Sequence, residues 1–314
     1  MQQQLQGRPA ADVGEFVRQA LAHYALSKPA AHFVAESFNT VYRVRAAEGH
    51  FAFRVSPARG IHEQGAVDAE EYFTERLHLA GVHVPRLVRT VDDRLTVRCS
   101  AAARWIGSML TWRHGVEPRM PPTSHTVTGL GDLSARLHRA SPPSAHRRVG
   151  ALDARDPRLF AVPHALGTAP PAHRDVLLRT SERVSRWLEE LWRSADEPPR
   201  LLHMDLTPRN VVIEAEGSMT PIDFQDIAWG HRVQDIANSL YGLTRGEFSP
   251  RVLNQFRAGY ERTADWPRAG AQELRRLFVA RRIAMVNLSL FLRRDGWEAY
   301  VARHCAALSR DDGG

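Results

Sequence analysis

Hydrophobic and polar positions in the first third of the chain alternate with two different periods. Apolar residues recur at helical spacing over residues 13–24 and again over residues 62–80. Runs with the shorter period of strands are expected at residues 33–34, 40–44, 50–55, 86–90 and 95–99. Glu48-Gly49 separates two of these strands, which are therefore predicted to form a hairpin. The pattern predicts a small antiparallel sheet accompanied by helices.

Helical spacing dominates the rest of the chain. Helices are expected around residues 130–137, 184–192, 250–260 and 270–294. Arg104-Trp105-Ile106-Gly107 is interpreted as the end of the sheet-rich part. The 314 residues suffice for roughly two domains. The chain is therefore predicted to be an α+β protein that divides into residues 1–106 and 107–314.

The stretch from Leu201 to Asn210 carries the strongest chemical signal. An apolar lead-in delivers His203, then Asp205 two residues later and Asn210 five after that, while Asp223 follows a second apolar run. A carboxylate held at the end of a buried strand can accept the proton of a hydroxyl during phosphoryl transfer. A lone Asp would more often cap a turn. The spacing to Asn210 and Asp223 favours a catalytic Asp205.

The residues between Asn210 and Asp223 predict how these two side chains meet. Residues 211–214 and 219–222 alternate around the turn at 215–218, which predicts a hairpin with Asn210 and Asp223 at the same end. An amide carbonyl oxygen and a carboxylate are suitable ligands for Mg²⁺, with phosphate oxygens completing its shell. Both residues are therefore candidate metal ligands. The alternative is an Asn in a turn and a solvated Asp.

Two further residues near this loop are expected to support it. His203 is grouped with Asp205 in the catalytic loop, and we expect it to orient Asp205 or the loop backbone without transferring a proton. Asp235 begins an apolar helical segment, where it either caps the helix or ties it to the catalytic loop. Both interpretations leave Asp205 as the proton acceptor.

The first part of the chain must supply a cation for nucleotide phosphates. The single lysine, Lys28, lies outside the expected strands. The role therefore falls to Arg54, in an alternating strand and paired with Glu70 of the following helix, or it is unfilled. The alternative for Arg54 is a surface position on an edge strand. No Gly-rich phosphate loop occurs, so Ser37 and Asn39 are candidate phosphate contacts in its place.

Composition limits the partners. Only two cysteines occur, which disfavours a disulfide framework and fits a cytoplasmic location. No apolar run approaches the length of a membrane span, and the first residues do not form a signal peptide. The net charge of +7 permits nucleic-acid binding, but the arginines are spread along helical faces without a basic block. Neither a membrane nor a nucleic acid is therefore an expected partner.

Taken together, these segments resemble the aminoglycoside/choline phosphotransferase family, a branch of the protein-kinase-like fold. Residues 37–44 are similar to its first hairpin, 51–55 to its third strand and 70–85 to its Glu-bearing helix. His203-Met204-Asp205 with Asn210 resembles the family's catalytic loop, with Met204 where Gly is more common. Residues 222–237 resemble its metal-binding segment and the helix that follows.

The resemblance implies a bilobal protein-kinase-like fold, with a small N-lobe of antiparallel sheet plus helix and a larger, mainly helical C-lobe. The nucleotide is expected to be ATP or GTP, bound with Mg²⁺. Family members phosphorylate hydroxylated small molecules, among them antibiotics and choline. Gln225 stands where protein kinases have Gly after Asp223-Phe224, which argues against a protein substrate. A monomer or homodimer is expected.

The sequence leaves two questions: which kind of molecule accepts the phosphate, and whether the protein turns over nucleotide at all. The segment 270–294 carries Arg275, Arg276, Arg281, Arg282, Arg293 and Arg294. We therefore expect a neutral, anionic or weakly cationic acceptor in place of a strongly cationic aminoglycoside. The missing lysine motivates a different class of function, a nucleotide-binding pseudokinase or regulatory module without turnover. The presence of Asp205, Asn210 and Asp223 argues against that alternative.

Overall fold

The computed structural model describes residues 11–58, 60–99 and 104–311, which form two compact units. One unit takes the described residues of Met1–Ile61 and Val84–His114. The other takes His62–His83 and the described residues of Gly115–Gly314. This division differs from the expected boundary between residues 106 and 107, because the helix after residue 61 groups with the second unit. As nucleotide-binding and catalytic lobes, residues 1–106 and 107–314 stay a prediction.

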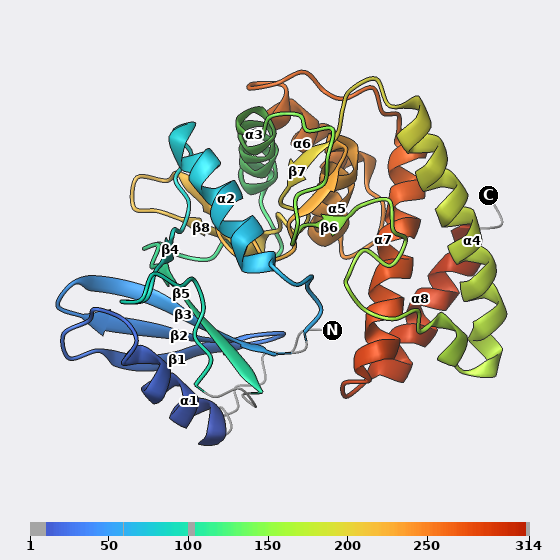
Figure 1. Ribbon diagram of the computed structural model, residues 1–314. Helices are drawn as coiled ribbons and strands as arrows, with labels where there is room; N and C mark the ends of the chain where they lie inside the picture. The colour runs from blue at the N-terminus through green and yellow to red at the C-terminus, as the bar shows by residue number, and fades with distance from the viewer. Residues whose placement is uncertain (1–10, 59, 100–103, 312–314) are drawn as a thin grey trace. The chain divides into compact units, whose positions relative to one another are not determined.

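A five-stranded antiparallel sheet forms most of the first unit (Figure 1). Its strands are β1 (Ala30–Glu36), β2 (Thr40–Ala46), β3 (Gly49–Pro57), β4 (Leu87–Val88) and β5 (Trp105–Thr111), in the spatial order β1-β2-β3-β5-β4. Helix α1 (Ala11–Leu21) packs on this sheet, and Phe16 of the helix shares one core with Val44 and Phe53 of the strands. The position of β3 between β2 and β5 makes it an interior strand.

The predicted hairpin between β2 and β3 is confirmed. Tyr42 pairs with Phe53 and Ala46 with Gly49 across the two antiparallel strands. Alternate residues of β2 are buried, as the sequence period requires. A local pattern with a short turn was therefore sufficient to predict this register.

Two other expectations for the first unit are wrong. The strand expected at residues 95–99 is reduced to a single bridge between Val97 and Gly107. Residues 104–107 do not end the sheet, because β5 begins at Trp105 and pairs with β3 along its length. Gly107 permits this pairing, since a Cβ at that position would lie 2.4 Å from the ring of Phe53.

Helices form most of the second unit (Figure 1). They are α2 (Ala66–Leu79), α3 (Ser124–Ala140), α4 (Pro171–Ser194), α5 (Arg232–Thr244), α6 (Pro250–Tyr260), α7 (Ala271–Leu292) and α8 (Trp297–Asp311), with short 3₁₀ turns at Leu166–Thr168 and Pro208–Asn210. Two small sheets complete the unit. One joins β6 (Leu152–Asp153), β10 (Ala228–Gly230) and β7 (Arg200–Leu202), and the other is the hairpin of β8 (Val211–Ile213) and β9 (Met219–Pro221).

The expected helices are present with shifted ends. The helix expected from residue 62 begins at Ala66, because Gly65 before it has a left-handed backbone with φ of 84°. Helix α8 lies beyond the last helix that the sequence pattern predicted.

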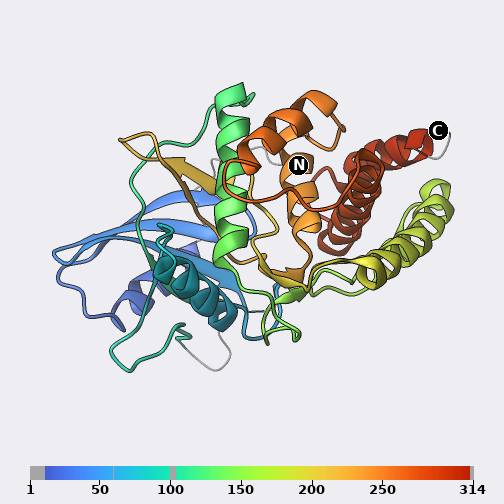
Figure 2. The same ribbon diagram turned by 90° about the horizontal axis from the view of Figure 1, so that it is seen from above.

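Helices α3 and α6 lie against each other with their backbones in close approach (Figure 2). A Cβ at Gly131 of α3 would lie 2.0 Å from the carbonyl oxygen of Phe256, and one at Gly259 of α6 would lie 1.9 Å from that of Thr128. Only glycine fits at both positions, because backbone atoms cannot move aside. The contact matters for the site, since His138 and Tyr260 come from the ends of these two helices.

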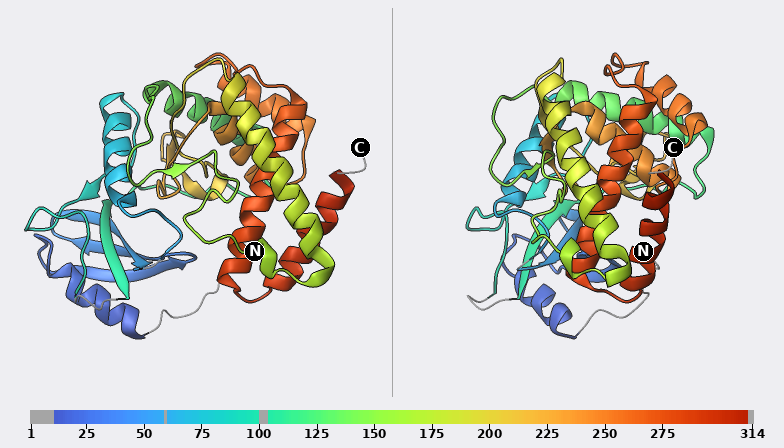
Figure 3. Two further views of the ribbon diagram at one scale, coloured as in Figure 1. Left: turned by 45° about the vertical axis from the view of Figure 1, so that its right-hand side comes forward. Right: turned by 90° about the vertical axis from the view of Figure 1, so that its right-hand side faces the viewer.

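Helices α4, α7 and α8 pack together on another side of the second unit (Figure 3). Helix α7 also contacts α5, which follows the segment that carries Asp223. Among the helices of the described ranges, none combines the length and the apolar character needed to cross a membrane.

Candidate active site

Strand β7 delivers the loop that carries Asp205. Leu201 and Leu202 are buried, and Leu202 pairs with Ala228 of β10. The chain leaves the strand at His203, which is fully buried, and reaches the partly exposed Asp205 two residues later. A rigid strand therefore holds the loop from one end, as the apolar lead-in predicted.

The carboxylate of Asp205 is held by two donors. Asn210 Nδ2 donates to Asp205 Oδ2 at 2.6 Å, and Arg281 Nη2 of α7 donates to Asp205 Oδ1 at 3.3 Å. The side chain keeps 33% of its surface accessible, so a substrate can still reach it. The pKa of Asp205 is raised to about 7, mainly by burial and also by the nearby carboxylates of Asp226 and Asp223, while Arg281 and the hydrogen bond from Asn210 act to lower it. A carboxyl group with this pKa is suited to exchange protons near neutral pH.

The hairpin between Asn210 and Asp223 is confirmed. Val211 pairs with Pro221 and Ile213 with Met219, and Ile222 N donates to Asn210 O at 2.8 Å. Asn210 and Asp223 therefore flank the same end of the hairpin, as predicted. Asp223 has a left-handed backbone with φ of 61°, a conformation that Asp tolerates better than most residues.

The donor atoms at this end of the hairpin suit a divalent cation bound together with phosphates. The NH₂ group of Asn210 donates to both the carbonyl and the carboxylate of Asp205, which leaves its carbonyl oxygen as the end available to a cation. Asp223 adds a carboxylate. Among the described residues, no cluster of three His, Cys, Asp or Glu is placed to hold a metal. The remaining ligands would have to come from a nucleotide or water.

His203 uses both ring nitrogens on backbone atoms. Asp205 N donates to His203 Nδ1 at 3.3 Å, and His203 Nε2 lies 3.1 Å from the carbonyl oxygen of Ile222. The ring also packs on Phe224, with centroids 4.6 Å apart. These contacts join the Asp205 loop to the segment that carries Asp223, and they agree with the expected orienting role.

Met204 lies between these two residues in a left-handed conformation, with φ of 63°. Asp235 Oδ1 accepts from Met204 N at 2.5 Å, and Asn238 Nδ2 donates to Met204 O at 3.1 Å. Helix α5 thus holds both the backbone N–H and the backbone carbonyl of Met204, a residue in a strained conformation. Of the two roles expected for Asp235, the tie to the catalytic loop is confirmed.

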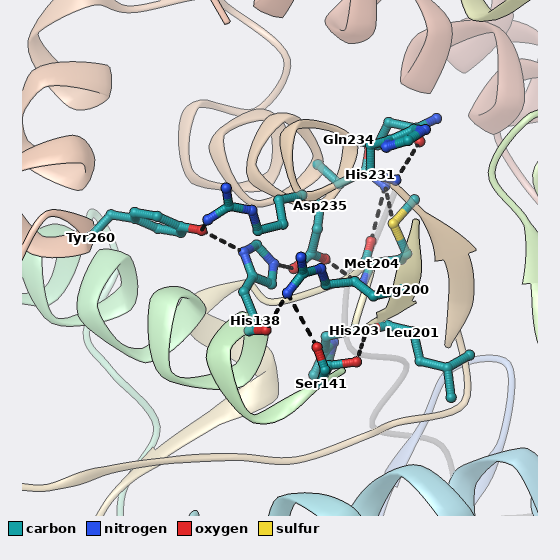
Figure 4. Close-up of polar contacts among 12 residues, drawn as sticks. His138, Ser141, Arg200, Leu201, His203, Met204, His231, Gln234, Asp235 and Tyr260 are labelled. Atoms are coloured by element: carbon teal, nitrogen blue, oxygen red, sulfur yellow. Dashed lines mark hydrogen bonds and ion pairs between the residues drawn. The ribbon is translucent and has the colours of Figure 1, made fainter. Parts of the chain in front are cut away.

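The anchor at Asp235 continues into a buried polar network (Figure 4). Asp235 Oδ2 lies 2.7 Å from His138 Nε2, and His138 Nδ1 lies 2.9 Å from the hydroxyl of Tyr260. Arg200 Nη1 donates to the carbonyl of His138 at 2.9 Å. The network therefore connects α3, α5 and α6 to the backbone of the loop that carries Asp205.

Three residues of the site were not identified from the sequence. His62 Nε2 lies 2.9 Å from Asp226 Oδ1, and although burial raises the pKa of Asp226, the hydrogen bond with His62 lowers it below the ordinary value. Arg281 was one of several arginines on its helix, with no signal to distinguish it. His62 and Arg281 are far from Asp226 and Asp205 in sequence, so no motif spacing could have joined them.

The candidate nucleotide residues are divided between the two units. Arg54 is only 5% exposed and lies on interior strand β3, which excludes the edge-strand surface alternative. Ser37 and Asn39 lie between β1 and β2, where Asn39 Oδ1 accepts from Ser56 Oγ at 2.8 Å. The structure thus brings these residues close to the end of β3. Glu70 is fully buried on α2 of the second unit, and its pairing with Arg54 stays a prediction.

A model of the phosphotransferase enzyme family matches residues 33–271. A search of curated protein sequences finds no match.

Solved structures are similar over nearly the whole chain. The amicoumacin kinase hAmiN, in complex with AMP-PNP and Ca²⁺, has a TM-score of 0.75 and 16% identity over 97% of this chain and 94% of its own. A microcompartment-associated aminopropanol kinase has a TM-score of 0.75 and 22% identity, and the match covers 95% of this chain and 97% of its own. A thermostable mutant of the aminoglycoside phosphotransferase APH(4)-Ia, in complex with ADP and hygromycin B, has a TM-score of 0.64 and 14% identity, and the match covers 97% of this chain and 100% of its own. These likenesses confirm the expected α+β, protein-kinase-like fold.

Proposed function

Because the chain belongs to the phosphotransferase enzyme family, we propose that it transfers the γ-phosphate of ATP or GTP to a hydroxyl group of a small molecule, with Mg²⁺ as the metal ion. The single observation that carries the proposal is the position of Asp205. Its carboxylate accepts a hydrogen bond from Asn210 at 2.6 Å and remains a third exposed, and Asn210 and Asp223 flank one end of the same hairpin.

Asp205 acts as the proton acceptor in this proposal. Its carboxylate orients the acceptor hydroxyl, whose oxygen forms a bond to the γ-phosphorus while the bond from that phosphorus to the bridging oxygen of the nucleotide breaks. The hydroxyl proton passes to Asp205, and the nucleoside diphosphate leaves. The partly ionised state of Asp205 near neutral pH suits this exchange.

Asn210 and Asp223 are the residues that would hold Mg²⁺. One amide oxygen and one carboxylate oxygen are hard ligands of the kind this ion prefers. When bound, Mg²⁺ supplies neutralisation of the charge on the nucleotide phosphates. His203 and Asp235 keep the two segments in place through their bonds to Ile222 O and Met204 N.

Arg54, Ser37 and Asn39 are proposed to contact the nucleotide phosphates, with Glu70 as the partner of Arg54. An Arg in this role binds phosphate oxygens in a forked manner that a lysine cannot reproduce. The burial of Arg54 on an interior strand supports a specific role over that of a solvated surface charge.

The acceptor is proposed to be a hydroxylated small molecule such as an antibiotic or an amino-alcohol-like metabolite. Structures of similar fold include an amicoumacin kinase, an aminopropanol kinase and a phosphotransferase bound to hygromycin B. The cytoplasmic location, the absence of a nucleic-acid partner and a monomeric or homodimeric state stay predictions.

Separate measurements of turnover and nucleotide binding test this function. Asp205→Ala is expected to abolish acceptor-dependent nucleotide consumption and to leave nucleotide binding near the wild-type value, because the carboxylate acts on the hydroxyl. Asp223→Ala is expected to weaken binding of the magnesium–nucleotide complex as well. Wild-type protein that binds the nucleotide and consumes none with any hydroxylated compound would favour the pseudokinase alternative.

A further inference from the structure

Arg281 lies beside the proposed proton acceptor and is almost entirely buried. The residue keeps 8% of its surface, and its Nη2 donates to Asp205 Oδ1 at 3.3 Å. Its guanidinium carbon is 5.4 Å from the centroid of the Phe160 ring, which holds the planar group from another side. The oxygen to which a substrate hydroxyl would donate its proton is therefore next to a fixed guanidinium.

One end of this guanidinium has no hydrogen-bond partner among the described residues. Nη1 of Arg281 is buried and makes no hydrogen bond to any of the described residues. A buried N–H of a charged group without an acceptor is costly, so such groups usually have a partner in the functional complex. Because Nη2 is bound to Asp205, an acceptor atom at Nη1 would lie beside the reacting hydroxyl.

The other arginines on helix α7 contact other residues. Arg282 Nη2 donates to Gly246 O at 2.8 Å, Arg276 lies 3.6 Å from Glu190, and Arg275 lies over the ring of Phe248. The number of arginines on this helix is therefore a weak guide to the acceptor. The position of Arg281 is the informative feature.

A pocket of suitable size is lined by Phe160, the residue whose ring contacts Arg281. Phe160 lines a pocket of about 460 Å³ together with charged residues of the same unit, which include Glu63, Arg147 and Arg158. Small-molecule sites commonly have volumes of roughly 300–1,000 Å³. Phe160 therefore lines this pocket and also contacts the guanidinium that binds Asp205, while Arg281 itself lines a smaller cavity of about 30 Å³.

We propose that Arg281 binds an oxygen atom of the acceptor on the carbon next to the phosphorylated hydroxyl. The inference rests on the proposed function, with Asp205 as proton acceptor. The two ends of a guanidinium fork are about as far apart as oxygens on neighbouring carbons. A hydroxyl that donates to Asp205 Oδ1 therefore places a neighbouring oxygen at Nη1. Vicinal diols and 2-hydroxy acids fit this arrangement. The inference narrows the proposed acceptors, because Arg281 repels the ammonium group of a vicinal amino alcohol.

Matched acceptors test this inference. The probes are two sets whose members differ only at the neighbouring carbon. The first set is lactate, propanediol, isopropanol and 1-amino-2-propanol, and the second is glucose, deoxyglucose and glucosamine. Larger hydroxylated antibiotics and their deoxy analogues are tested as well. Wild-type kcat/KM is expected to favour the member with the neighbouring oxygen by roughly 10- to 100-fold, the effect of one hydrogen bond to a charged group. Arg281→Met is expected to remove this preference by lowering kcat/KM for that member alone.

The control variant is Arg276→Met on the same helix. It removes a partly exposed arginine that contacts Glu190 and should leave the preference unchanged. An equal loss for both members of a pair in Arg281→Met would show a purely structural role and overturn the inference. A wild-type preference for the amino alcohol or the deoxy compound would overturn it while leaving the proposed function intact. Failure of wild-type protein to phosphorylate any member would contradict the proposed function and the inference with it.

Discussion

Replacement of Asp235 by Ala tests how the catalytic loop is held. The carboxylate of Asp235 is fully buried and bonds on one side to Met204 N at 2.5 Å and on the other to His138 Nε2 at 2.7 Å. Truncation leaves a backbone N–H and an imidazole without their partner in a region closed to water. The left-handed Met204, with φ of 63°, also loses one of the two side chains that hold it.

The magnitude follows from these two bonds. A buried hydrogen-bonding group left without a partner costs about 1–3 kcal/mol, and Asp235→Ala leaves two such groups, Met204 N and His138 Nε2. We therefore expect Asp235→Ala to lower the free energy of unfolding by about 2–5 kcal/mol. Urea denaturation followed by circular dichroism measures this change, with an unaltered m value indicating that the folded state is retained.

Asp235→Asn is the matched control. Its carbonyl oxygen can still accept from Met204 N, and its NH₂ group can donate to His138 if the imidazole takes the other tautomer toward Tyr260. The expected loss is about 1–2 kcal/mol, because the charge-assisted part of both bonds is removed. A loss below about 1 kcal/mol for Asp235→Ala would refute the argument that this network holds the loop.

Three further predictions concern Asp205 and the helix packing. Only the ionised form of Asp205 can accept a proton, and its pKa is raised to about 7. We therefore expect kcat/KM to rise with pH up to about 7 and to level off above it. A flat profile from about pH 5 to 9 would contradict this. The pKa of Asp205 in the folded state lies above the unfolded value of 3.8, so its ionisation lowers the stability of the folded protein as pH rises. Asp205→Asn should therefore be more stable than wild type in thermal unfolding, by an amount that grows from about pH 4 to about pH 7. A difference that does not change with pH would contradict a raised pKa of Asp205. Gly131→Ala places a Cβ 2.0 Å from Phe256 O and should lower the unfolding free energy by at least about 3 kcal/mol, whereas the control Gly14→Ala meets nothing within 4 Å and should be neutral or slightly stabilising.

The parts of the site that were predictable from the sequence are those that local periodicity determines. The hairpin from Val211 to Pro221 follows from two alternating runs around a short turn, and its geometry fixes which residues lie at the open end. The apolar run before Asp205 likewise predicted a buried strand. Residues only a few positions apart in the sequence can adopt very few arrangements relative to one another.

The contacts that were not predictable join distant segments. Arg281 meets Asp205 across 76 positions, and His62 meets Asp226 across 164. Their positions depend on how whole helices pack, and the pattern of one helix does not contain that information. The same reason explains the missed start of β5, since the short apolar run from Trp105 is compatible with a strand or with the end of one.

Met204 shows how the structure accounts for an unusual residue in a motif. The position resembles one where Gly is more common, and the structure gives it a left-handed backbone that Gly adopts without cost. The hydrogen bonds from Met204 N to Asp235 and from Asn238 to Met204 O offset the cost for Met, and Met204 is buried with 3% of its surface exposed. The sequence showed that Met204 stands where Gly is more common, but only the backbone angle explains why Gly is favoured there.

Analysis of the acceptor after reaction tests the central claim most directly. Wild-type protein, magnesium–nucleotide and an accepted hydroxylated compound should yield a phosphate monoester of that compound, detected by mass spectrometry and phosphorus NMR. Asp205→Asn keeps the shape of the side chain and lacks the proton acceptor, so the rate of ester formation should fall by roughly 10²- to 10⁴-fold. Ester formation at the wild-type rate by Asp205→Asn would contradict the account.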